Sequence, residues 1–238
     1  MDFDLNEEQQ MIKKMVADFA DKEIAPVAAQ YDQEEKFPEE IVKKMGALGI
    51  FGTVIPEEYG GGGFDYISHA LVAEELGRVD SSVRGIYSVQ ISLVTLSILR
   101  WGTEDQKRMY VPRLASGEIL GCFGLTEPNS GSDVASMQAS AVLDGDSYVL
   151  NGNKMWISNG CADVALIFAK TDKSAGHRGI TAFIVDTKTP GFSSRDIHGK
   201  LGLRASSTAE LILEDVRVPK ENVLGNPGDG FKVAMSAL

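Results

Sequence analysis

The sequence comprises 238 residues, of which 43% are apolar and 24% charged, and its formal net charge is −11. This balance is typical of a soluble globular protein with one or two domains. The negative charge argues against a surface for nucleic acid or for cationic attachment to a membrane, although it does not exclude a local basic site for a phosphorylated ligand. The longest uninterrupted apolar run, Val164 to Ala169, is far too short to span a bilayer, and the acidic N-terminus is unlike a secretory signal. We therefore expect neither nucleic acid binding nor membrane insertion.

Cysteine and histidine usage gives no indication of a disulfide framework or of a metal site. Cys122 and Cys161 lack framework spacing, and the three histidines are scattered along the chain. The simplest interpretation is that both thiols are reduced and that the protein lies in the cytoplasm, or in a compartment like the mitochondrial matrix if the protein is eukaryotic.

The first 120 residues are predicted to form a helical domain. Apolar residues recur at steps of three and four in residues 5–20, with Asn6 as the expected N-cap and Pro26 as an end or a kink. Thr103 is expected to begin a later helix. Further helices are predicted over residues 38–48, 66–78 and 82–99. Because the segment 82–99 is the most apolar of the sequence, its helix is expected to be buried.

From residue 121 the periodicity changes to that of strands. Alternating segments flank Asp144-Gly145-Asp146, which predicts a hairpin, and "DVALIFAKT", "GITAFIVDT" and "TAELILEDVRVP" predict further strands. Helical pattern returns after "NPGDG". We expect an α+β multidomain chain with a helical domain over 1–120, a β domain over 121–226 and the start of a further helical domain over 227–238. Because the last pattern stops in mid-helix, the chain is expected to be part of a longer protein.

The segment "LTEPNSGSDV", residues 125–134, is the first candidate site. Its turn residues can place successive backbone N–H groups in one concavity, and Thr126, Ser130 and Ser132 add hydroxyl donors. Such a segment suits a pyrophosphate or the edge of a heteroaromatic ring. On composition alone, a polar bend at the surface is the better interpretation.

The segment "KMWISNG", residues 154–160, is the second candidate. Strand alternation places Trp156 and Ser158 on one face, where a flat ring beside a hydroxyl could bind an isoalloxazine or a purine. Taken alone, the pattern favours Trp156 in the core of a barrel and Ser158 as a turn cap.

Arg84 is the third candidate, because it lies in the most apolar predicted helix, where an unpaired cation is costly to bury. It could reach water, pair with Asp80 four residues earlier, or bind a ligand carboxylate through its planar guanidinium. The chain carries no G-x-G-x-x-G, G-x-x-x-x-G-K-[ST] or G-x-S-x-G motif, so a nicotinamide-dependent Rossmann enzyme and a serine hydrolase are poor interpretations.

The order of several long motifs resembles the flavin-dependent acyl-CoA dehydrogenases over the whole chain. These motifs are "LGIFGTVIPEEYGGGG", "GTEDQKRMYVPRLASGEILGCFGLTEPNSGSD", "LNGNKMWISNG", "KLGLRASSTAELILEDVRVPKENVLG" and "GDGF". The resemblance implies a helical N-terminal domain, a β-barrel or two-sheet middle domain, and a C-terminal four-helix bundle that is missing from these residues. It also implies a homotetramer.

The same resemblance assigns the candidate residues to a FAD cofactor and an acyl-CoA substrate, with no metal. Thr126 would face the flavin, Ser132 would lie near the pyrophosphate and the acyl-CoA, and the Ser158 hydroxyl would lie near the flavin ring. The residues implied for FAD are Phe123, Gly124, Leu125, Thr126, Glu127, Pro128, Asn129, Ser130, Gly131, Ser132, Trp156, Ile157 and Ser158. Those implied for the substrate are Arg84, Gly85, Ser132 and Phe231.

The implied reaction is the α,β-dehydrogenation of an acyl-CoA thioester in fatty acid or carboxylic acid catabolism, with electrons passed to an electron-transfer flavoprotein. In the family a glutamate of the C-terminal domain removes the α proton, and no residue of this chain matches it. We therefore expect no catalytic residue within residues 1–238.

Within the family, "RVDSSVRGIYSVQ" and "GCFGLTEPNSGSD" are most similar to the glutaryl-CoA dehydrogenase branch, in which an arginine at the position of Arg84 binds the distal carboxylate. Gly77 and Gly85 replace the acidic residue and the serine of that branch, which leaves an alicyclic acyl group and the question of decarboxylation open. Two other hypotheses are a flavoprotein oxidase or monooxygenase of the same fold and a non-catalytic binding module.

Overall fold

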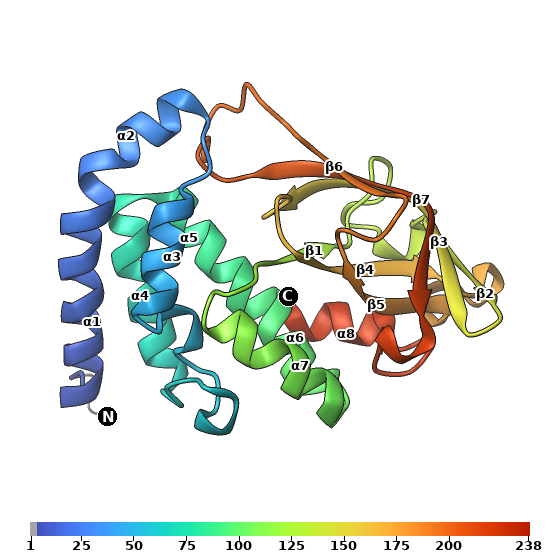
Figure 1. Cartoon of the computed structure of the whole chain (residues 1–238), viewed down its shortest axis with the longest axis horizontal. Helices are drawn as coiled ribbons and strands as arrows, with labels where there is room; N and C mark the ends of the chain where they lie inside the picture. Colours follow the sequence, from blue (N-terminus) through green and yellow to red (C-terminus); the bar gives the residue numbers. More distant parts are fainter. Residues whose placement is uncertain (1–3) are drawn as a thin grey trace.

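The computed structural model describes residues 4–238, and it shows helices on one side of the molecule and a β-sheet on the other (Figure 1). The expected fold class, a helical N-terminal part followed by a β middle part, is confirmed. Residues 1–3 of the predicted domain 1–120 lie outside the described residues, and the three domain limits remain a proposal. The helices are α1 Glu7–Phe19, α2 Ala25–Glu34, α3 Glu39–Ala47, α4 Tyr66–Val79, α5 Ser81–Ser88, α6 Leu96–Trp101, α7 Glu104–Ala115 and α8 Gly230–Ala237.

Local capping fixes where two of these helices begin. The Asn6 side chain accepts a hydrogen bond from the backbone of Gln9, whose side chain bonds back to Asn6, and Thr103 and Gln106 do the same at α7. The predicted N-cap at Asn6 and the predicted helix start at Thr103, which is the N-cap of α7, are therefore confirmed. Pro26 lies in the first turn of α2, directly after a π-helical segment, Ala20–Ile24, so the chain bends there and remains helical.

The apolar segment predicted over 82–99 is one continuous helical run from Ser81 to Trp101. It consists of α5, a π-helical segment Val89–Thr95, and α6. By length and composition this run is the one helix among residues 4–238 that could cross a membrane, but most of it is buried inside the protein. It is the core helix of the helical part, as its apolar pattern predicts.

The described chain forms one eight-stranded sheet, in which seven strands follow the order β6-β7-β3-β2-β4-β5-β8 and β1, off this path, pairs with β4. A single residue pair, Ser140 with Lys170, joins β2 to β4, so the path divides into two sheet halves that face each other. The predicted hairpin at residues 144–146 joins β2 to β3. The strands are β1 Gly121–Gly124, β2 Ser140–Asp144, β3 Ser147–Ser158, β4 Val164–Lys170, β5 Ile180–Asp186, β6 Phe192–Asp196, β7 Thr208–Pro219 and β8 Val223–Leu224.

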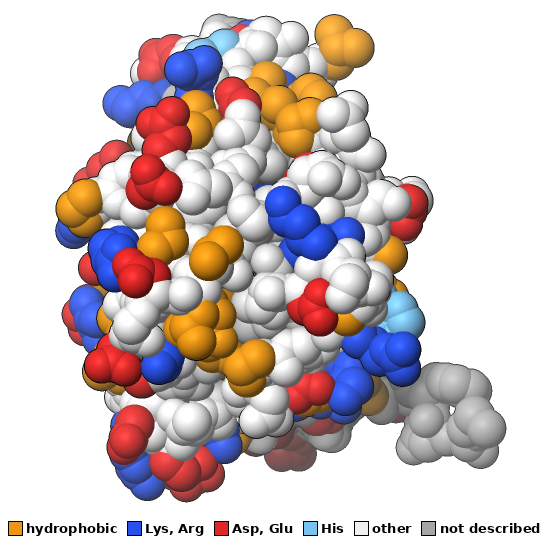
Figure 2. All heavy atoms as spheres, turned by 90° about the vertical axis from the view of Figure 1, so that its right-hand side faces the viewer, with side chains coloured by type: hydrophobic (Ala, Val, Ile, Leu, Met, Phe, Trp, Pro, Cys, Tyr) orange, Lys and Arg blue, Asp and Glu red, His pale blue; other side chains and the backbone are white. Residues whose placement is uncertain are grey.

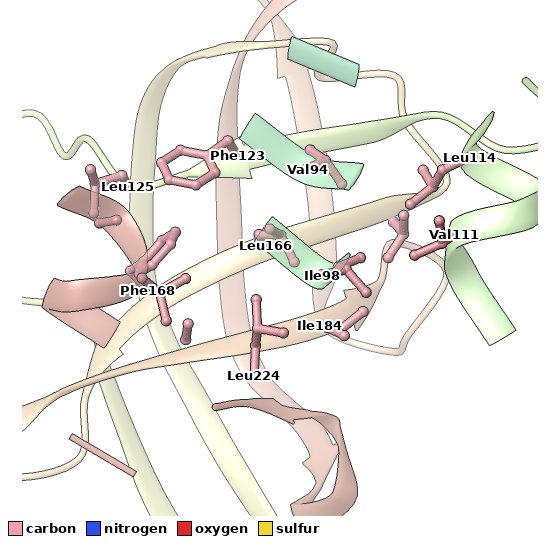
Figure 3. Close-up of a cluster of buried hydrophobic side chains, with 14 of the residues drawn as sticks. Val94, Ile98, Val111, Leu114, Phe123, Leu125, Leu166, Phe168, Ile184 and Leu224 are labelled. Carbon is pink, nitrogen blue, oxygen red and sulfur yellow. The ribbon is translucent and has the colours of Figure 1, made fainter. Parts of the chain in front are cut away.

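Buried side chains connect the two parts of the molecule. The Tyr148 and Phe183 rings meet edge to face, with centroids 5.1 Å apart, between the two sheet halves. A second cluster joins helices to strands: Val94 and Ile98 lie against Leu166 and Ile184 (Figure 3). This shared core fixes the sheet relative to the long helix, which matters because both contribute to the site described below.

The loop between β6 and β7 reaches back to α2 (Figure 1). Arg204 pairs with Glu35 at 2.8 Å, and the same carboxylate accepts hydrogen bonds from the Gly199 backbone and the His198 ring. Glu35 adopts a left-handed conformation, with φ of +50°, at the end of α2. The hydrogen bonds from Gly199 are the largest cause of the lowered pKa of Glu35, and Arg204 adds to it.

The surface carries charged side chains of both signs. On the face drawn in Figure 2, acidic and basic groups alternate with small apolar patches, and the described residues there form no continuous basic stretch. On this face, the mixture of signs agrees with the net negative charge of the sequence.

Candidate functional site

A cavity of about 170 Å³ lies where the two candidate segments meet the long helix. Segment 123–126 forms one wall and segment 156–158 forms another, while the π-helical segment closes a third side. The structure therefore brings together residues that sequence analysis placed in two separate candidate sites. The cavity is lined by Val89, Leu93, Phe123, Leu125, Thr126, Trp156, Ile157, Ser158 and Leu238.

The wall that contains Trp156 is shaped by an irregularity in β3. The register with β7 shifts between Lys154 and Ile157, and Trp156 has a φ of +63°, which non-glycine residues rarely adopt. The shift turns the indole outward, so that 62% of the residue is exposed while Ile157 is buried. The interpretation of Trp156 as barrel core is therefore wrong. Strict alternation fails here because a bulge re-aims the side chain.

Two hydroxyls at the cavity have no hydrogen-bond partner among residues 4–238. Neither Thr126 Oγ1 nor Ser158 Oγ makes a hydrogen bond with any described residue, and both residues are half-buried. Unpaired donors beside an exposed indole suit the polar edge of a flat heteroaromatic ring. A pocket for a whole cofactor usually measures roughly 300–1,000 Å³, so the described residues form part of such a site.

Residues 127–130 of the segment 125–134 line a second cavity, of about 340 Å³. Its lining includes Pro128, Asn129 and Ser130, and a short bridge between Glu127 and Ser130 forms the turn. Gly131 and Ser132 are exposed, and no described residue is a hydrogen-bond partner of the Ser132 hydroxyl. The predicted polar bend and the predicted binding wall are thus two portions of one segment.

Three residues that were predicted to bind the cofactor or the substrate do not line the cavity of Trp156. Gly124 is buried, and a Cβ there would lie 2.6 Å from Ile167 Cδ1, so this position serves core packing. The Glu127 side chain is buried in an ion pair. Phe231, on α8, packs its ring at 5.2 Å from His177 and does not line the cavity of Trp156.

Arg84 lies on α5 with its side chain half-buried and without an ion pair or hydrogen bond to any residue from 4 to 238. Asp80 is not its partner, because the Asp80 carboxylate caps α5 by accepting from the backbone N–H groups of Ser82 and Val83. A Cβ on Gly77 would lie 3.3 Å from Arg84 Cγ, so glycine at that position lets the arginine stem pack closely against α4. Arg84 precedes Val89 by five residues, or about 7–8 Å along the helix axis.

Sequence reasoning missed the buried polar residues that hold the walls in place. Lys154 is fully buried and pairs with Glu127, and Gln90 is fully buried with three hydrogen bonds to the backbone of Leu114, Ile119 and Gly121. The sequence did contain one indication of the buried lysine. Tyr148 and Leu150 point toward the core at every second position of β3, and the same alternation places Lys154 on the inward face.

A cavity of about 580 Å³, larger than the one at Trp156, lies between α4 and α6 and is separate from these walls. His69 lines it and bonds to the Tyr87 hydroxyl at 2.7 Å, and burial lowers the pKa of His69. No carboxylate lines this cavity in the described chain, nor do its residues include a cluster of three or more metal-ligating side chains. Sequence analysis gave no indication of it.

Comparison with known proteins identifies the family. The acyl-CoA dehydrogenase N-terminal domain matches residues 6–118, and the acyl-CoA dehydrogenase middle domain matches residues 122–216. A short-chain specific acyl-CoA dehydrogenase from Clostridium acetobutylicum is 48% identical over 239 residues, which cover 100% of this chain and 63% of that protein.

Two solved structures show the same similarity in three dimensions. A glutaryl-CoA dehydrogenase in complex with glutaryl-CoA is 47% identical with a TM-score of 0.96, over 100% of this chain and 61% of that one. A glutaryl-CoA dehydrogenase from Mycobacterium smegmatis in complex with FADH2 is 42% identical with a TM-score of 0.92, over 98% and 59%. The chain thus spans about three fifths of the length of these relatives. The chain belongs to the acyl-CoA dehydrogenase family.

Proposed function

We propose that this chain supplies the helical and β domains of a FAD-dependent acyl-CoA dehydrogenase, which oxidises an acyl-CoA thioester to the 2-enoyl-CoA. The observation that carries the proposal is the cavity at Trp156, where the unpaired hydroxyls of Thr126 and Ser158 flank an exposed indole. Membership of the family supports it, as does the reduced FAD in the mycobacterial relative. The proposed domain limits are 1–120, 121–226 and 227–238.

In this proposal the residues of the cavity bind and orient the ring, while FAD when bound supplies the chemistry of accepting a hydride from the substrate. The hydroxyls of Thr126 and Ser158 donate hydrogen bonds to the polar edge of the ring. Trp156 lies against its flat surface, and the apolar side chains of Val89 and Leu93 exclude water from it. Ser132, an exposed residue of the segment 125–134, is proposed to contact the pyrophosphate and the acyl-CoA.

The catalytic base is proposed to lie outside residues 1–238. No acidic residue of the described chain lines the cavity of Trp156. The buried carboxylates are already engaged, Glu127 with Lys154 and Glu75 with Arg78. A general base must reach the α carbon of the substrate, and neither of these groups is free to do so. Residues 1–238 alone are expected to show no acyl-CoA oxidation, so robust turnover by that fragment would contradict this assignment.

A dicarboxylyl substrate such as glutaryl-CoA is the more specific candidate. Its support is Arg84, a half-buried guanidinium without a partner among the described residues, which could bind a distal carboxylate with two parallel hydrogen bonds. Gly77 and Gly85 carry no side chain beside it, so an alicyclic acyl group is the alternative. An electron-transfer flavoprotein as acceptor, a homotetramer, and a cytoplasmic or mitochondrial matrix location are further parts of the proposal.

A substrate panel on the enzyme that carries these residues tests the proposal. FAD-loaded protein is expected to oxidise acyl-CoA thioesters with an artificial electron acceptor and to react slowly with oxygen. Rapid oxygen consumption would favour an oxidase, and no bound flavin would favour a non-catalytic module.

Arg84 is tested on the same panel of glutaryl-, cyclohexanecarboxyl- and butyryl-CoA. Arg84→Ala is expected to lose activity selectively toward glutaryl-CoA, by about tenfold or more for a lost charge-assisted hydrogen bond. Arg84→Lys retains the charge but not the planar fork, so it should recover only part of that loss. Equal losses on all three substrates would instead make Arg84 a structural residue.

A further inference from the structure

A buried ion pair lies directly behind the two walls of the cavity. Lys154 Nζ is 2.8 Å from Glu127 Oε1, and the two residues are 0% and 6% exposed. Among the salt bridges of residues 4–238, this is the one in which both side chains are buried. Such a pair is weak evidence for stability, because desolvation of two charges offsets their attraction. Its geometry shows a more specific consequence.

The Glu127 carboxylate is fully engaged. Oε1 accepts from Lys154 and from the Ala139 backbone at 2.9 Å, and Oε2 accepts from the Gln138 backbone at 2.5 Å. The carboxylate therefore ties the segment after β1 to the two residues that precede β2. Three donors satisfy this charge in the interior, as a buried carboxylate requires.

Lys154 makes a second contact that joins the walls. Its ammonium donates to the Leu125 carbonyl at 3.1 Å, and the next residue, Met155, donates its backbone N–H to the Thr126 carbonyl at 2.9 Å. Residues 154 and 155 of β3 thus bond to three consecutive residues, 125, 126 and 127. The bulge that turns Trp156 outward follows at once. One lysine therefore fixes the wall of Thr126 relative to the wall of Trp156 and Ser158.

We propose that Lys154, paired with Glu127, is a positioning residue that sets the two walls at the separation needed to bind the flavin ring. This inference rests on the proposed function, since it assigns the cavity to FAD. Lys154 touches neither the cavity nor its ligand, and it acts through Leu125, Thr126 and Trp156. Loss of the pair is expected to lower FAD affinity and to change the surroundings of Trp156 even in flavin-free protein.

The test uses Lys154→Met, Glu127→Gln and the double variant in a Trp101→Phe background, which leaves Trp156 as the single tryptophan of residues 1–238. The measurements are the thermal midpoint, the dissociation constant for FAD, and the emission and acrylamide quenching of Trp156 without flavin. Lys154→Met leaves a buried carboxylate without its counter-charge and should lower the midpoint. The double variant removes both charges and should restore most of the midpoint.

The double variant separates positioning from stability. If Lys154 positions the walls, this variant binds FAD at least about tenfold more weakly despite its restored midpoint, because a charge-assisted tie is gone. Trp156 quenching should change in parallel. If FAD affinity and Trp156 quenching both return to those of the unmodified protein along with the midpoint, the pair is only structural and the proposal is overturned. The double variant also decides the matter if Lys154→Met fails to fold.

Two controls complete the design. Lys220→Met with Asp146→Asn removes an exposed pair of the same chemistry at the far end of the β2–β3 hairpin, and Val185→Ala lowers stability in the β core at a residue that does not line the cavity of Trp156. Both are expected to leave FAD affinity and Trp156 quenching unchanged. If the unmodified protein fails to bind FAD, the proposed function fails, whereas the Trp156 measurements in flavin-free protein still decide whether Lys154 sets the walls.

Discussion

Gln90 is predicted to hold the long helix against the β domain, and Gln90→Met tests this directly. Its amide nitrogen donates to the carbonyls of Leu114 and Ile119, each at 2.9 Å, and its amide oxygen accepts from the Gly121 N–H at 2.8 Å. Methionine has nearly the same length and can fill the same space, so the substitution removes the hydrogen bonds without opening a cavity. The Ile119 carbonyl and the Gly121 N–H are then left unpaired in the interior, whereas the Leu114 carbonyl keeps a hydrogen bond from the Gly117 N–H at 3.2 Å.

The expected loss follows from the two groups that lose their partner. An unsatisfied buried donor or acceptor costs about 1–3 kcal/mol, so two cost about 2–6 kcal/mol, reduced somewhat because the glutamine amide no longer has to be desolvated. That is a large fraction of the roughly 5–15 kcal/mol that stabilises a typical protein. Urea unfolding followed by circular dichroism measures the change as a shift of the midpoint at constant slope.

Ile91→Val is the matched control, since Ile91 is the next residue on the same π-helical segment and is also fully buried. It should cost only about 0.5–1.5 kcal/mol, because it removes one methylene group. If Gln90→Met costs no more than Ile91→Val, the three hydrogen bonds do not hold the helix and the reasoning is refuted.

Two further predictions concern titratable groups. Burial raises the pKa of Cys122 to about 12, whereas Cys161 is exposed. Iodoacetamide at pH 8 should therefore label Cys161 and spare Cys122 until the protein unfolds. Mass spectrometry of the labelled peptides checks this, and equal labelling of the two cysteines would show that Cys122 is accessible. The lowered pKa of Glu35 implies that the contact between the β6–β7 loop and α2 is fully stabilising above the ordinary value of 4.5 and weakens as the pH falls through the lower folded pKa. Hydrogen exchange of the Gly199 amide should therefore lose protection at acidic pH in the unmodified protein but be insensitive to this transition in Glu35→Gln.

Features set by neighbouring residues were predictable from the sequence. Asn6 and Thr103 cap their helices because a short polar side chain can reach a backbone N–H three residues later, and this needs no tertiary information. The hairpin at residues 144–146 formed as expected, since Gly145 supplies the positive φ of its turn.

Features set by distant residues were not predictable in this way. The short strands β1 and β8 are strands because of their partners, β4 and β5, and not because of their own alternation. The outward turn of Trp156 depends on a register shift against β7, which no local pattern reveals. Sequence analysis could name Thr126, Trp156 and Ser158 as candidates, but their meeting at one cavity, and the role of Lys154 behind it, required the three-dimensional arrangement.

Titration of FAD into flavin-free protein, followed by Trp156 fluorescence in the Trp101→Phe background, tests the central claim most directly. We predict saturable quenching at one FAD per chain, with Thr126→Val and Ser158→Ala each weakening binding by about three- to tenfold, as expected for one lost hydrogen bond. Ser193→Ala, which removes an exposed hydroxyl on β6 outside the cavity, should bind as the unmodified protein does. FAD binding that leaves Trp156 unquenched and is indifferent to Thr126 and Ser158 would contradict the assignment of this cavity to the flavin.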